Sequence, residues 1–564
     1  MKELFSAIEL KRLISKGEGQ FIEFKSLWDL KDGGKKTLNR RTARDLIAEY
    51  VAAFANADGG TLLLGVDDDG TPSGHAYPED VIADFIAVPE RRLRPAVRVD
   101  VQQIELEGYK VSVMQIPMAP EAVMVDGDGF PYRVGNQVIH EPQEVINQRK
   151  QAYRRVGYEQ QVRPDATIDD LDMALAEEYL NKTPYAGRPA LEILQRYGLI
   201  IPKGKTFAVT NAALLLFCKT PSLRWHPRSG VRIFRVDGTD RKHGTRRNVA
   251  QQTPLEPPLA RMIPEAHKSL AAQIGKSEKL HSLFFREMPE YPTFAWQEAL
   301  VNAIAHRDYN EQGREIEVWF FDDRMEIQSP GELVPPVTIA KLKNRQRVHA
   351  SRNPLIVRVL VDVGIMREEG EGIPRIFEEM EESLLRQPEF SLETASFFIT
   401  LRNEPVYTGH SPIWGMLIER FRLGMNQKRV LLANPGGFSN EVYRKLTGVD
   451  RDQAYREIQE LVTLGILEGA PSAGRGAVYR IAPALNQQRA WLESRILKLI
   501  TYFGAHDQLT NSEFCRLYGL TRFVATRELK RMVDDGYLIL SGSGRGAHYL
   551  PGPMLARFLQ DCAK

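Results

Sequence analysis

The chain has 564 residues, of which 43% are hydrophobic and 26% charged, a composition typical of ordinary soluble globular proteins. This length predicts roughly three to five domains at ~100–200 residues each. Lys and Arg total 75 against 73 Asp and Glu, so the overall charge indicates no class of partner. No apolar run reaches the ~18 residues of a membrane span and no signal-peptide pattern occurs, so we expect a cytoplasmic protein without a membrane partner. The cysteines have no disulfide or metal-ligand spacing.

Three carboxylates lie near the ends of predicted strands close to the N-terminus. Residues 21–25 alternate in polarity, which predicts a strand whose charged face carries Glu23 and Lys25. Residues 61–66 read as a buried strand that follows a Gly-Gly turn and ends at Asp67. With Glu18, these carboxylates form an oxygen-rich site suited to Mg²⁺ or Mn²⁺, which could activate water on a phosphodiester. The alternative is an exposed Glu23–Lys25 ion pair and a simple turn at Asp67.

Residues 10 to 145 resemble the Schlafen fold, a module also found in bacterial proteins of the Alba-like DNA-binding class. The resemblance is carried by Glu18, by EFK at 23–25, AFAN at 53–56, the glycine pair at 59–60, GVDD at 65–68 and YRVGN at 132–136. In family members that are nucleases, it implies that Glu18, Glu23 and Asp67 are catalytic metal ligands and that Lys25 helps to hold phosphate. Other members only bind nucleic acid, so both alternatives stay open.

Two basic stretches could neutralise phosphates, which would make binding dependent on salt. The first leads into a predicted helix at 45–54, beside the acidic site, and includes Lys35, Lys36, Arg40, Arg41 and Arg44. The second runs from residue 224 to residue 247, with aromatic residues interleaved. The alternative is that each is a solvated charged face. Two such stretches favour nucleic acid, RNA or DNA, as a partner.

A helical pattern near residue 300 aligns Glu298, Asn302 and His306 on one face. Two predicted strands follow, at 315–321 and 325–328, and the second leads into Ser329 and Gly331. A glutamate and an asparagine at this spacing suit water activation and Mg²⁺ coordination. Farther on, a glycine loop at 369–373 opens a helix, whose N-terminal N–H groups could bind phosphate.

Residues 286 to 405 resemble the Bergerat-type ATPase fold, in the divergent version found behind Schlafen-like modules in bacterial proteins described as transcriptional regulators. The resemblance implies that Glu298 is a general base, Asn302 a Mg²⁺ ligand, and Gly370 and Gly372 the phosphate loop for ATP. The acidic residue that recognises adenine in this superfamily is replaced by Ser329, before Gly331. The alternative is a degenerate domain kept for dimerisation.

The C-terminal region contains an internal repeat. LVTLGIL at 461–467 with a glycine-rich segment at 472–479 returns as MVDDGYL at 532–538 with a similar segment at 543–549. The order of helix, turn, helix and hairpin resembles the winged helix–turn–helix family. It implies recognition helices at about 451–464 and 522–534, with Arg475 and Arg545 on the wings at the DNA backbone or minor groove. Winged helices also serve as protein-interaction modules, so a homo-oligomer is the alternative use.

The predicted fold class is α+β and multidomain, with a Schlafen-like α/β core, a Bergerat-type ATPase-like α/β sandwich and tandem winged helices. The predicted domains span 1–148, 149–285 (a connecting α/β region), 286–405, 425–483 and 490–553. Two functions remain open: a metal-dependent endonuclease on structured RNA of the tRNA class, regulated by nucleotide and acting in antiviral host defence, or an ATP-binding, DNA-binding transcriptional regulator. The substrate, the signal and the oligomeric state stay undetermined by the sequence.

Overall fold

The computed structural model describes residues 4–29, 36–126, 129–281, 284–367, 370–406, 412–469, 477–553 and 555–556. The chain divides into two compact units. The first comprises Met1–Glu278 and Glu287–Glu404, and the second comprises Lys279–Arg286 and Pro405–Lys564. Among the described helices, we find none with the length and apolar character needed to cross a membrane. The prediction of a mixed α+β multidomain protein is confirmed.

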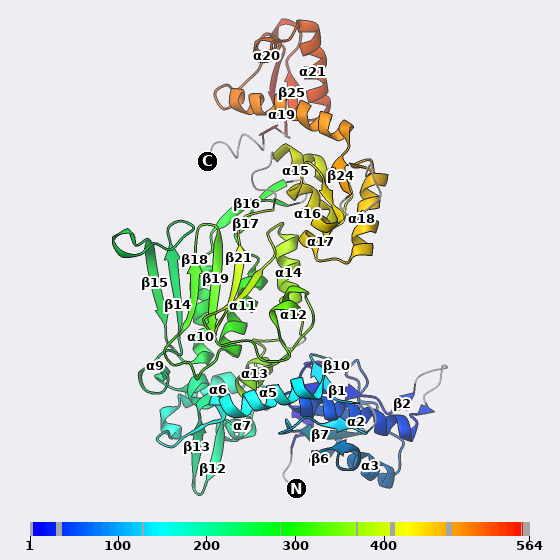
Figure 1. The fold of residues 1–564 in the computed structure, drawn as a ribbon, viewed down its shortest axis with the longest axis vertical. Helices are drawn as coiled ribbons and strands as arrows, with labels where there is room; N and C mark the ends of the chain where they lie inside the picture. The colour runs from blue at the N-terminus through cyan, green and yellow to red at the C-terminus, as the bar shows by residue number, and fades with distance from the viewer. Residues whose placement is uncertain are drawn as a thin grey trace. The chain divides into compact units, whose positions relative to one another are not determined.

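The N-terminal module of the first unit contains a four-stranded sheet in the order β1-β4-β7-β6, with β1 and β4 parallel (Figure 1). Its helices are α1 (Ala7–Ile14), α2 (Arg40–Asn56), α3 (Glu79–Ile86), α4 (Val88–Arg92) and α5 (Gln143–Val156). Its strands are β1 (Ile22–Lys25), β2 (Trp28–Asp29), β3 (Lys36–Thr37), β4 (Gly60–Leu64), β5 (Leu93–Arg94), β6 (Asp100–Leu106), β7 (Tyr109–Ile116), β8 (Met124–Val125), β9 (Pro131–Val134) and β10 (Gln137–His140). The apolar face of α2 packs on this sheet, with Phe54 and its neighbours fully buried. Helix α2 begins earlier than the predicted helix because Asn39 caps it, accepting a hydrogen bond from the Arg41 N–H.

A connecting region follows, which packs into the same large core as the ATPase-like part. Its helices are α6 (Met173–Leu180), α7 (Ala190–Arg196), α8 (Asn211–Phe217) and α9 (Pro221–Arg224), and its strands β11 (Val162–Arg163), β12 (Ile200–Lys203) and β13 (Thr206–Thr210) form a small sheet. Residues 149–156, which the sequence analysis assigns to the connecting region, belong to helix α5. Arg149 and Lys150 are buried there because they donate to backbone carbonyls at the end of α2.

The ATPase-like part is built on a six-stranded sheet in the order β15-β14-β18-β19-β21-β20. Its strands are β14 (Val231–Val236), β15 (Val249–Leu255), β18 (Ile316–Phe320), β19 (Arg324–Pro330), β20 (Glu389–Glu393) and β21 (Ser396–Arg402). Its helices are α10 (Leu259–Ala271), α11 (Thr293–His306), α12 (Ile339–Lys343), α13 (Pro354–Asp362) and α14 (Gly372–Glu382). Helix α10 packs on β14 and β15, and α11 packs on β19 and against α14. Residues of α11, α14, β19 and β21 line the candidate pocket, which therefore lies where these helices meet the sheet.

The second unit contains two successive groups of helices, each followed by a short antiparallel pair of strands. The first has α15 (Pro412–Glu419), α16 (Met425–Ala433), α17 (Asn440–Thr447), α18 (Arg451–Thr463), β22 (Phe438–Ser439), β23 (Leu467–Glu468) and β24 (Val478–Ile481). The second has α19 (Pro483–Phe503), α20 (Asn511–Tyr518), α21 (Arg522–Asp534), β25 (Leu538–Ser541) and β26 (His548–Pro551). A hairpin of β16 (Lys276–His281) and β17 (Phe284–Pro289) connects α10 to α11 along the chain. The repeat is visible in the caps: Gly448 and Gly519 both end a helix in the left-handed conformation.

Candidate functional sites

The acidic site at the N-terminus is neutralised by two basic side chains. Glu23 on β1 is 1% exposed. Lys25 Nζ donates to one oxygen of this carboxylate, and Arg133 Nη2 from β9 lies 2.5 Å from the other. Arg133 is itself held by the Gly19 carbonyl at 2.6 Å. The predicted Glu23–Lys25 pair therefore exists, but the expectation that it would be exposed is wrong, since Arg133 encloses it.

Glu18 lies beside this pair, and Asp67 follows the end of β4. Glu18 Oε1 accepts a hydrogen bond from the Phe24 N–H at 2.9 Å and lies 3.7 Å from Lys25 Nζ. Burial, and then the nearby charge of Glu23, raise the pKa of the Glu18 carboxyl. Asp67 Oδ1 is buried and has no hydrogen-bond partner among the described residues.

No group of three or more His, Cys, Asp and Glu side chains suited to a metal ion is found in the described part of the chain. Because Lys25 and Arg133 occupy both oxygens of Glu23, a metal there would have to displace a buried cation. The metal and catalytic roles of Glu18, Glu23 and Asp67 stay predictions. So does the role of Lys25 toward phosphate, since its ammonium donates to Glu23 and to the Phe24 carbonyl.

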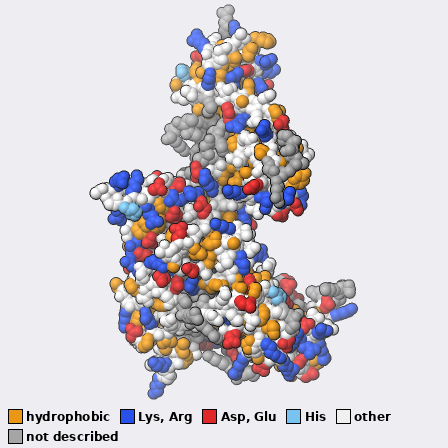
Figure 2. Space-filling model, in the orientation of Figure 1, with side chains coloured by type: hydrophobic (Ala, Val, Ile, Leu, Met, Phe, Trp, Pro, Cys, Tyr) orange, Lys and Arg blue, Asp and Glu red, His pale blue; other side chains and the backbone are white. Residues whose placement is uncertain are grey.

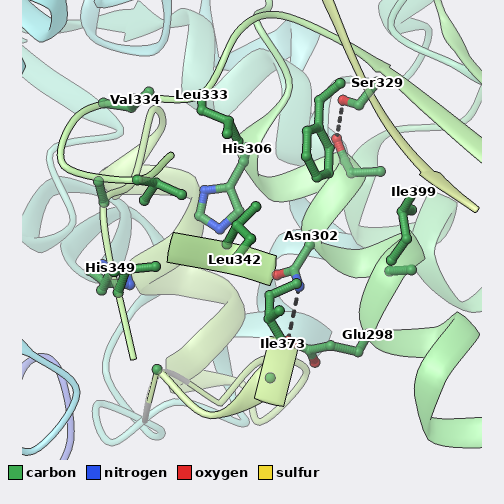
Figure 3. A pocket seen from close by; sticks show the side chains of 18 of the residues that line it. Glu298, Asn302, His306, Ser329, Leu333, Val334, Leu342, His349, Ile373 and Ile399 are labelled. Carbon is green, nitrogen blue, oxygen red and sulfur yellow. Dashed lines mark hydrogen bonds between the residues drawn. The ribbon is translucent and has the colours of Figure 1, made fainter. Parts of the chain in front are cut away.

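A pocket in the ATPase-like part brings Glu298 and Asn302 together with the predicted phosphate loop (Figure 3). Asn302 Nδ2 donates to Glu298 Oε1 at 3.0 Å. Gly372 begins α14 directly against this pair: a Cβ there would lie 1.9 Å from Glu298 Oε1. Any other residue at 372 would therefore displace the Glu298 carboxylate. Burial raises the pKa of Glu298, which the hydrogen bond from Asn302 partly opposes.

The other residues predicted to bind nucleotide line the same pocket, but the Ser329 hydroxyl is engaged in a hydrogen bond within the protein. Gly370 and Gly331 both line it and both have positive φ, of 67° and 118°. A Cβ at Gly331 would lie 2.8 Å from the Asp308 Cβ, so this turn also requires glycine. Ser329 lies on β19 and lines the pocket, but its hydroxyl donates to the Ala303 carbonyl at 2.9 Å. Its hydroxyl proton is therefore already used within the protein.

One wall of the pocket is held by the N-terminal module. His349 lines the pocket, and its Nε2 lies 2.8 Å from Asp58 Oδ2 in the turn after α2. Tyr132 of β9 donates from its hydroxyl to the His349 carbonyl at 3.1 Å. Burial would raise the pKa of Asp58, but Arg149 and His349 outweigh it and hold that pKa well below its usual range. Tyr132 belongs to one of the quoted motifs and Asp58 lies between two others, yet nothing in them indicated contacts 217 and 291 residues away along the chain.

The predicted phosphate-binding residues of the first basic stretch lie at the start of α2. Lys36, Arg40 and Arg41 are exposed, and the first turn of α2 contains no acid. The only ion pairs of Arg41 and Arg44 in the described structure are long ones to Asp45 and Asp84, at 3.9 and 3.5 Å. Lys35 lies outside the described residues, as does Arg475. Arg545 belongs to a short 3-10 turn, Gly544–Gly546, and its side chain is not described.

The second basic stretch divides into two parts. Its first part is used in ion pairs: Arg224 with Asp170 at 2.9 Å, and Arg232 with Glu315 at 2.6 Å. Its second part forms the exposed loop between β14 and β15, where basic side chains gather (Figure 2). The loop carries Arg241, Lys242, His243, Arg246 and Arg247, and none of these has an ion pair within the described structure.

Two family models match the chain. Residues 18–142 match the Schlafen AlbA_2 family, and residues 313–401 match a family described as putative ATP-dependent DNA helicase recG C-terminal, an ATPase-like domain. The chain is therefore a Schlafen-like protein with a divergent ATPase-like domain, as the sequence predicted. The Schlafen match indicates nucleic-acid binding. Glu298 and Asn302 precede the matched ATPase-like segment, so their roles depend on the pocket geometry.

Two of the solved structures that are similar to this chain differ in coverage: one matches most of its length and the other about a quarter of it. The DIP2311 protein from Corynebacterium diphtheriae is 20% identical over 94% of this chain and 95% of its own, with a TM-score of 0.39. The N-terminal domain of a putative ATP-dependent DNA helicase RecG-related protein from Nitrosomonas europaea is 27% identical, with a TM-score of 0.18. That match covers 25% of this chain and 93% of the domain. Comparison with curated proteins finds no match.

Proposed function

We propose that this chain is a nucleotide-responsive nucleic-acid-binding regulator. In this proposal its ATPase-like pocket binds a purine nucleoside triphosphate with Mg²⁺, and its basic surfaces hold a nucleic-acid backbone. The observation that carries the proposal is the close contact of Glu298, Asn302 and Gly372, where an added Cβ at residue 372 would overlap the Glu298 carboxylate. The absence of a side chain at Gly372 lets the N-terminus of α14, which suits phosphate, approach a carboxylate and an amide oxygen, which suit Mg²⁺.

Each pocket residue has a role in this proposal. The Asn302 side-chain oxygen would be a Mg²⁺ ligand, while its amide nitrogen keeps Glu298 oriented. The N–H groups of Gly372 and Ile373 would donate to phosphate oxygens, since the first turn of a helix leaves its N–H groups without partners, whereas Pro374 has no N–H and the Arg375 N–H donates to the Glu371 carbonyl. Glu298 would orient the attacking water if the nucleotide is hydrolysed, and burial, which raises the pKa of its carboxyl, makes it a stronger base than an exposed glutamate.

The contact between His349 and Asp58 supports a response of the N-terminal module to nucleotide. His349 lines the pocket, whereas Asp58 belongs to the turn between α2 and β4 of the nucleic-acid-binding module. A nucleotide that moves the wall of the pocket would therefore act on a buried ion cluster of the module. Coupling requires only that the ligand favours one of two arrangements of this wall.

The basic start of α2 and the β14–β15 loop are the proposed nucleic-acid surfaces. Arg40, Arg41 and Arg44 lie at the helix terminus where the macrodipole is already positive, an arrangement that favours an anion as the missing partner. In the β14–β15 loop, Asn248 fixes the backbone by accepting from the Lys242 N–H at 2.9 Å and donating to the Asp237 carbonyl at 2.6 Å. This loop therefore presents its cations in a defined arrangement.

A nucleotide and nucleic-acid titration tests this proposal. Mg²⁺-ATP at millimolar concentration should raise the melting temperature of the full chain by mass action. It should also change the affinity for duplex DNA or for structured RNA, measured by fluorescence anisotropy at several salt concentrations. If neither melting temperature nor affinity changes with ATP or GTP, the ATPase-like domain is a degenerate structural element and the proposal fails.

The second candidate is a metal-dependent endonuclease on structured RNA, acting in host defence. The buried Asp67 Oδ1, which has no hydrogen-bond partner among the described residues, favours it, because a metal ion would supply the missing partner. Mn²⁺-dependent cleavage of tRNA should then be lost in Asp67→Asn, with RNA binding retained. If the wild-type chain with Mn²⁺ cuts neither tRNA nor duplex DNA, the endonuclease assignment fails.

The second unit is proposed to contain the tandem winged helices of the sequence analysis. The order α17, α18, β23, β24 and its counterpart α20, α21, β25, β26 support this assignment. Both candidate recognition helices carry acids, including Glu457, which accepts from Tyr443, and Glu528, which pairs with Arg495. These acids favour assembly into a homo-oligomer over DNA contact as the main use of this unit. Sedimentation of the full chain at several concentrations checks the assembly.

A further inference from the structure

The pocket has two ends that are set by helix α11. Glu298 lies against the phosphate loop, whereas His306 lies eight residues farther along the same helix face, at a distance of ~12 Å along its axis. A nucleoside triphosphate whose phosphates lie at Gly372 would therefore place its base near His306. The walls at this end are apolar, with Leu333 and Val334 among them, as a base requires (Figure 3).

Ser329 is poorly suited to recognise the base. Its side chain is 6% exposed, and its single hydroxyl proton is donated to the Ala303 carbonyl. Turning the hydroxyl toward a ligand would leave that carbonyl without this bond. The superfamily's acidic residue is thus replaced by a group whose proton serves the fold. Its oxygen keeps acceptor lone pairs, but its small exposed surface favours another polar side chain for base recognition.

His306 has the properties of that side chain. Its ring lies in the pocket, between the Leu333–Val334 segment and His349 (Figure 3). Its Nδ1 is buried and has no hydrogen-bond partner among the described residues. An unpaired buried polar atom of this kind costs about 1–3 kcal/mol, which a ligand that pairs with it would recover. Burial, with the adjacent His349, lowers the pKa of His306 to about 4, so the ring is neutral at pH 7 and offers one donor and one acceptor.

We propose that His306 recognises the six-position edge of a purine base, in the place of the acidic residue that Ser329 replaces. This inference rests on the proposed nucleotide function of the same pocket. An acid only accepts hydrogen bonds, whereas a neutral imidazole accepts from the 6-amino group of adenine in one tautomer and donates to the 6-oxo group of guanine in the other. The pocket therefore binds ATP and GTP with similar affinity. His349, held by Asp58, is a positioning residue beside it.

Calorimetric titrations of the full chain with Mg²⁺ salts of ATP, GTP and inorganic triphosphate test this inference. His306→Phe keeps a ring but removes both nitrogens, and it should weaken ATP and GTP binding roughly tenfold while leaving triphosphate binding unchanged. His306→Gln retains a donor and an acceptor and should restore most of the lost affinity. Ser329→Ala, the matched control, should change the ATP-to-GTP ratio by less than about twofold, since its hydroxyl is used within the protein.

A ligand-side measurement does not depend on whether a variant folds. Purine riboside triphosphate, which lacks the 6-amino group, should bind the wild-type chain roughly tenfold more weakly than ATP, and the difference should vanish in His306→Phe. Equal affinities of the wild-type chain for these two ligands would overturn the inference, as would unchanged ATP affinity in His306→Phe. If the wild-type chain binds neither nucleotide nor triphosphate, the proposed function itself fails.

Discussion

Glu23 and Glu298 are both buried glutamates, each in a part of the chain that matches or adjoins a known family, but their surroundings differ. Glu23 lies between Lys25 and Arg133, so both of its oxygens have a cationic partner. Glu298 has an amide, Asn302, as its hydrogen-bond partner and faces the space kept by Gly372. The first carboxylate is paired with two cations within the module, whereas the second has an uncharged partner. The residue type alone does not distinguish these two uses.

Glu23→Gln should have the largest effect, because it leaves Lys25 and Arg133 without their buried counter-charge. Removing one member of a buried ion cluster costs about 3–5 kcal/mol of unfolding free energy. Urea unfolding monitored by fluorescence measures this loss. The matched control is Glu107→Gln, whose pair with Lys11 is more than half exposed and should be worth at most about 1 kcal/mol.

Removal of metal ions with a chelator tests further whether Glu23 differs from Glu298 in being only an ion-pair residue. If Glu23 is a structural ion-pair residue, EDTA should leave the unfolding curve of the wild-type chain unchanged. A clear loss of stability with EDTA, reversed by Mn²⁺, would instead indicate that a metal ion is bound at the acidic site and would restore the endonuclease candidate.

Asn302→Ala should remove the stabilisation by Mg²⁺-ATP, because it deletes the proposed Mg²⁺ ligand and frees the Glu298 carboxylate. For the wild-type chain, ATP at 100 times its Kd stabilises by about 2.7 kcal/mol. Thermal unfolding with and without nucleotide checks the loss. The matched control is Gln297→Ala, because Gln297 lies on the same helix but contacts His267 and does not line the pocket. This control should retain the nucleotide shift; if both variants retain it, the ligand role of Asn302 is wrong.

Glu298→Gln should raise the unfolding free energy of the nucleotide-free chain at pH 7. This change is opposite in sign to that of Glu23→Gln and smaller in size. Burial raises the pKa of Glu298 above its usual 4.5, so between pH 4.5 and the raised pKa the folded state binds more protons than the unfolded state. Unfolding free energy contributed by this group is therefore lost as pH rises through that window. The glutamine variant should lack this decline while still accepting the hydrogen bond from Asn302. Urea unfolding at a series of pH values measures it, and a destabilised variant at pH 7 would contradict this account.

Deleting residues 405–564 should have the smallest effect on the first unit, because the second unit has a core of its own, which includes Trp414. The melting temperature of the remaining chain should stay within a few degrees of the corresponding transition in the full protein. If the deleted unit contacts DNA, duplex affinity and its salt dependence fall together. If it mediates assembly, the sedimentation coefficient falls while duplex affinity measured at high protein concentration survives.

Local sequence patterns predicted several helices and the residues of α11 and α14 that line the candidate pocket. The helical spacing of Glu298, Asn302 and His306 placed them on one face of α11, and the structure has this helix at Thr293–His306. The glycine at 372 indicated a helix start, which α14 confirms. Helix α21 has the predicted bounds, Arg522–Asp534. These features depend on residues within one or two turns of each other, for which periodicity and capping are sufficient.

Long-range contacts decided what the side chains can do. The sequence by itself determined that Glu23 and Lys25 share a strand, but only the tertiary structure decided that Arg133, 110 positions later, closes the carboxylate off. Likewise, the sequence determined that Ser329 stands where an acid is expected, and packing against α11 decided where its hydroxyl proton goes. The charge environment and hydrogen bonding of a buried group depend on neighbours brought together by folding, which no local pattern encodes.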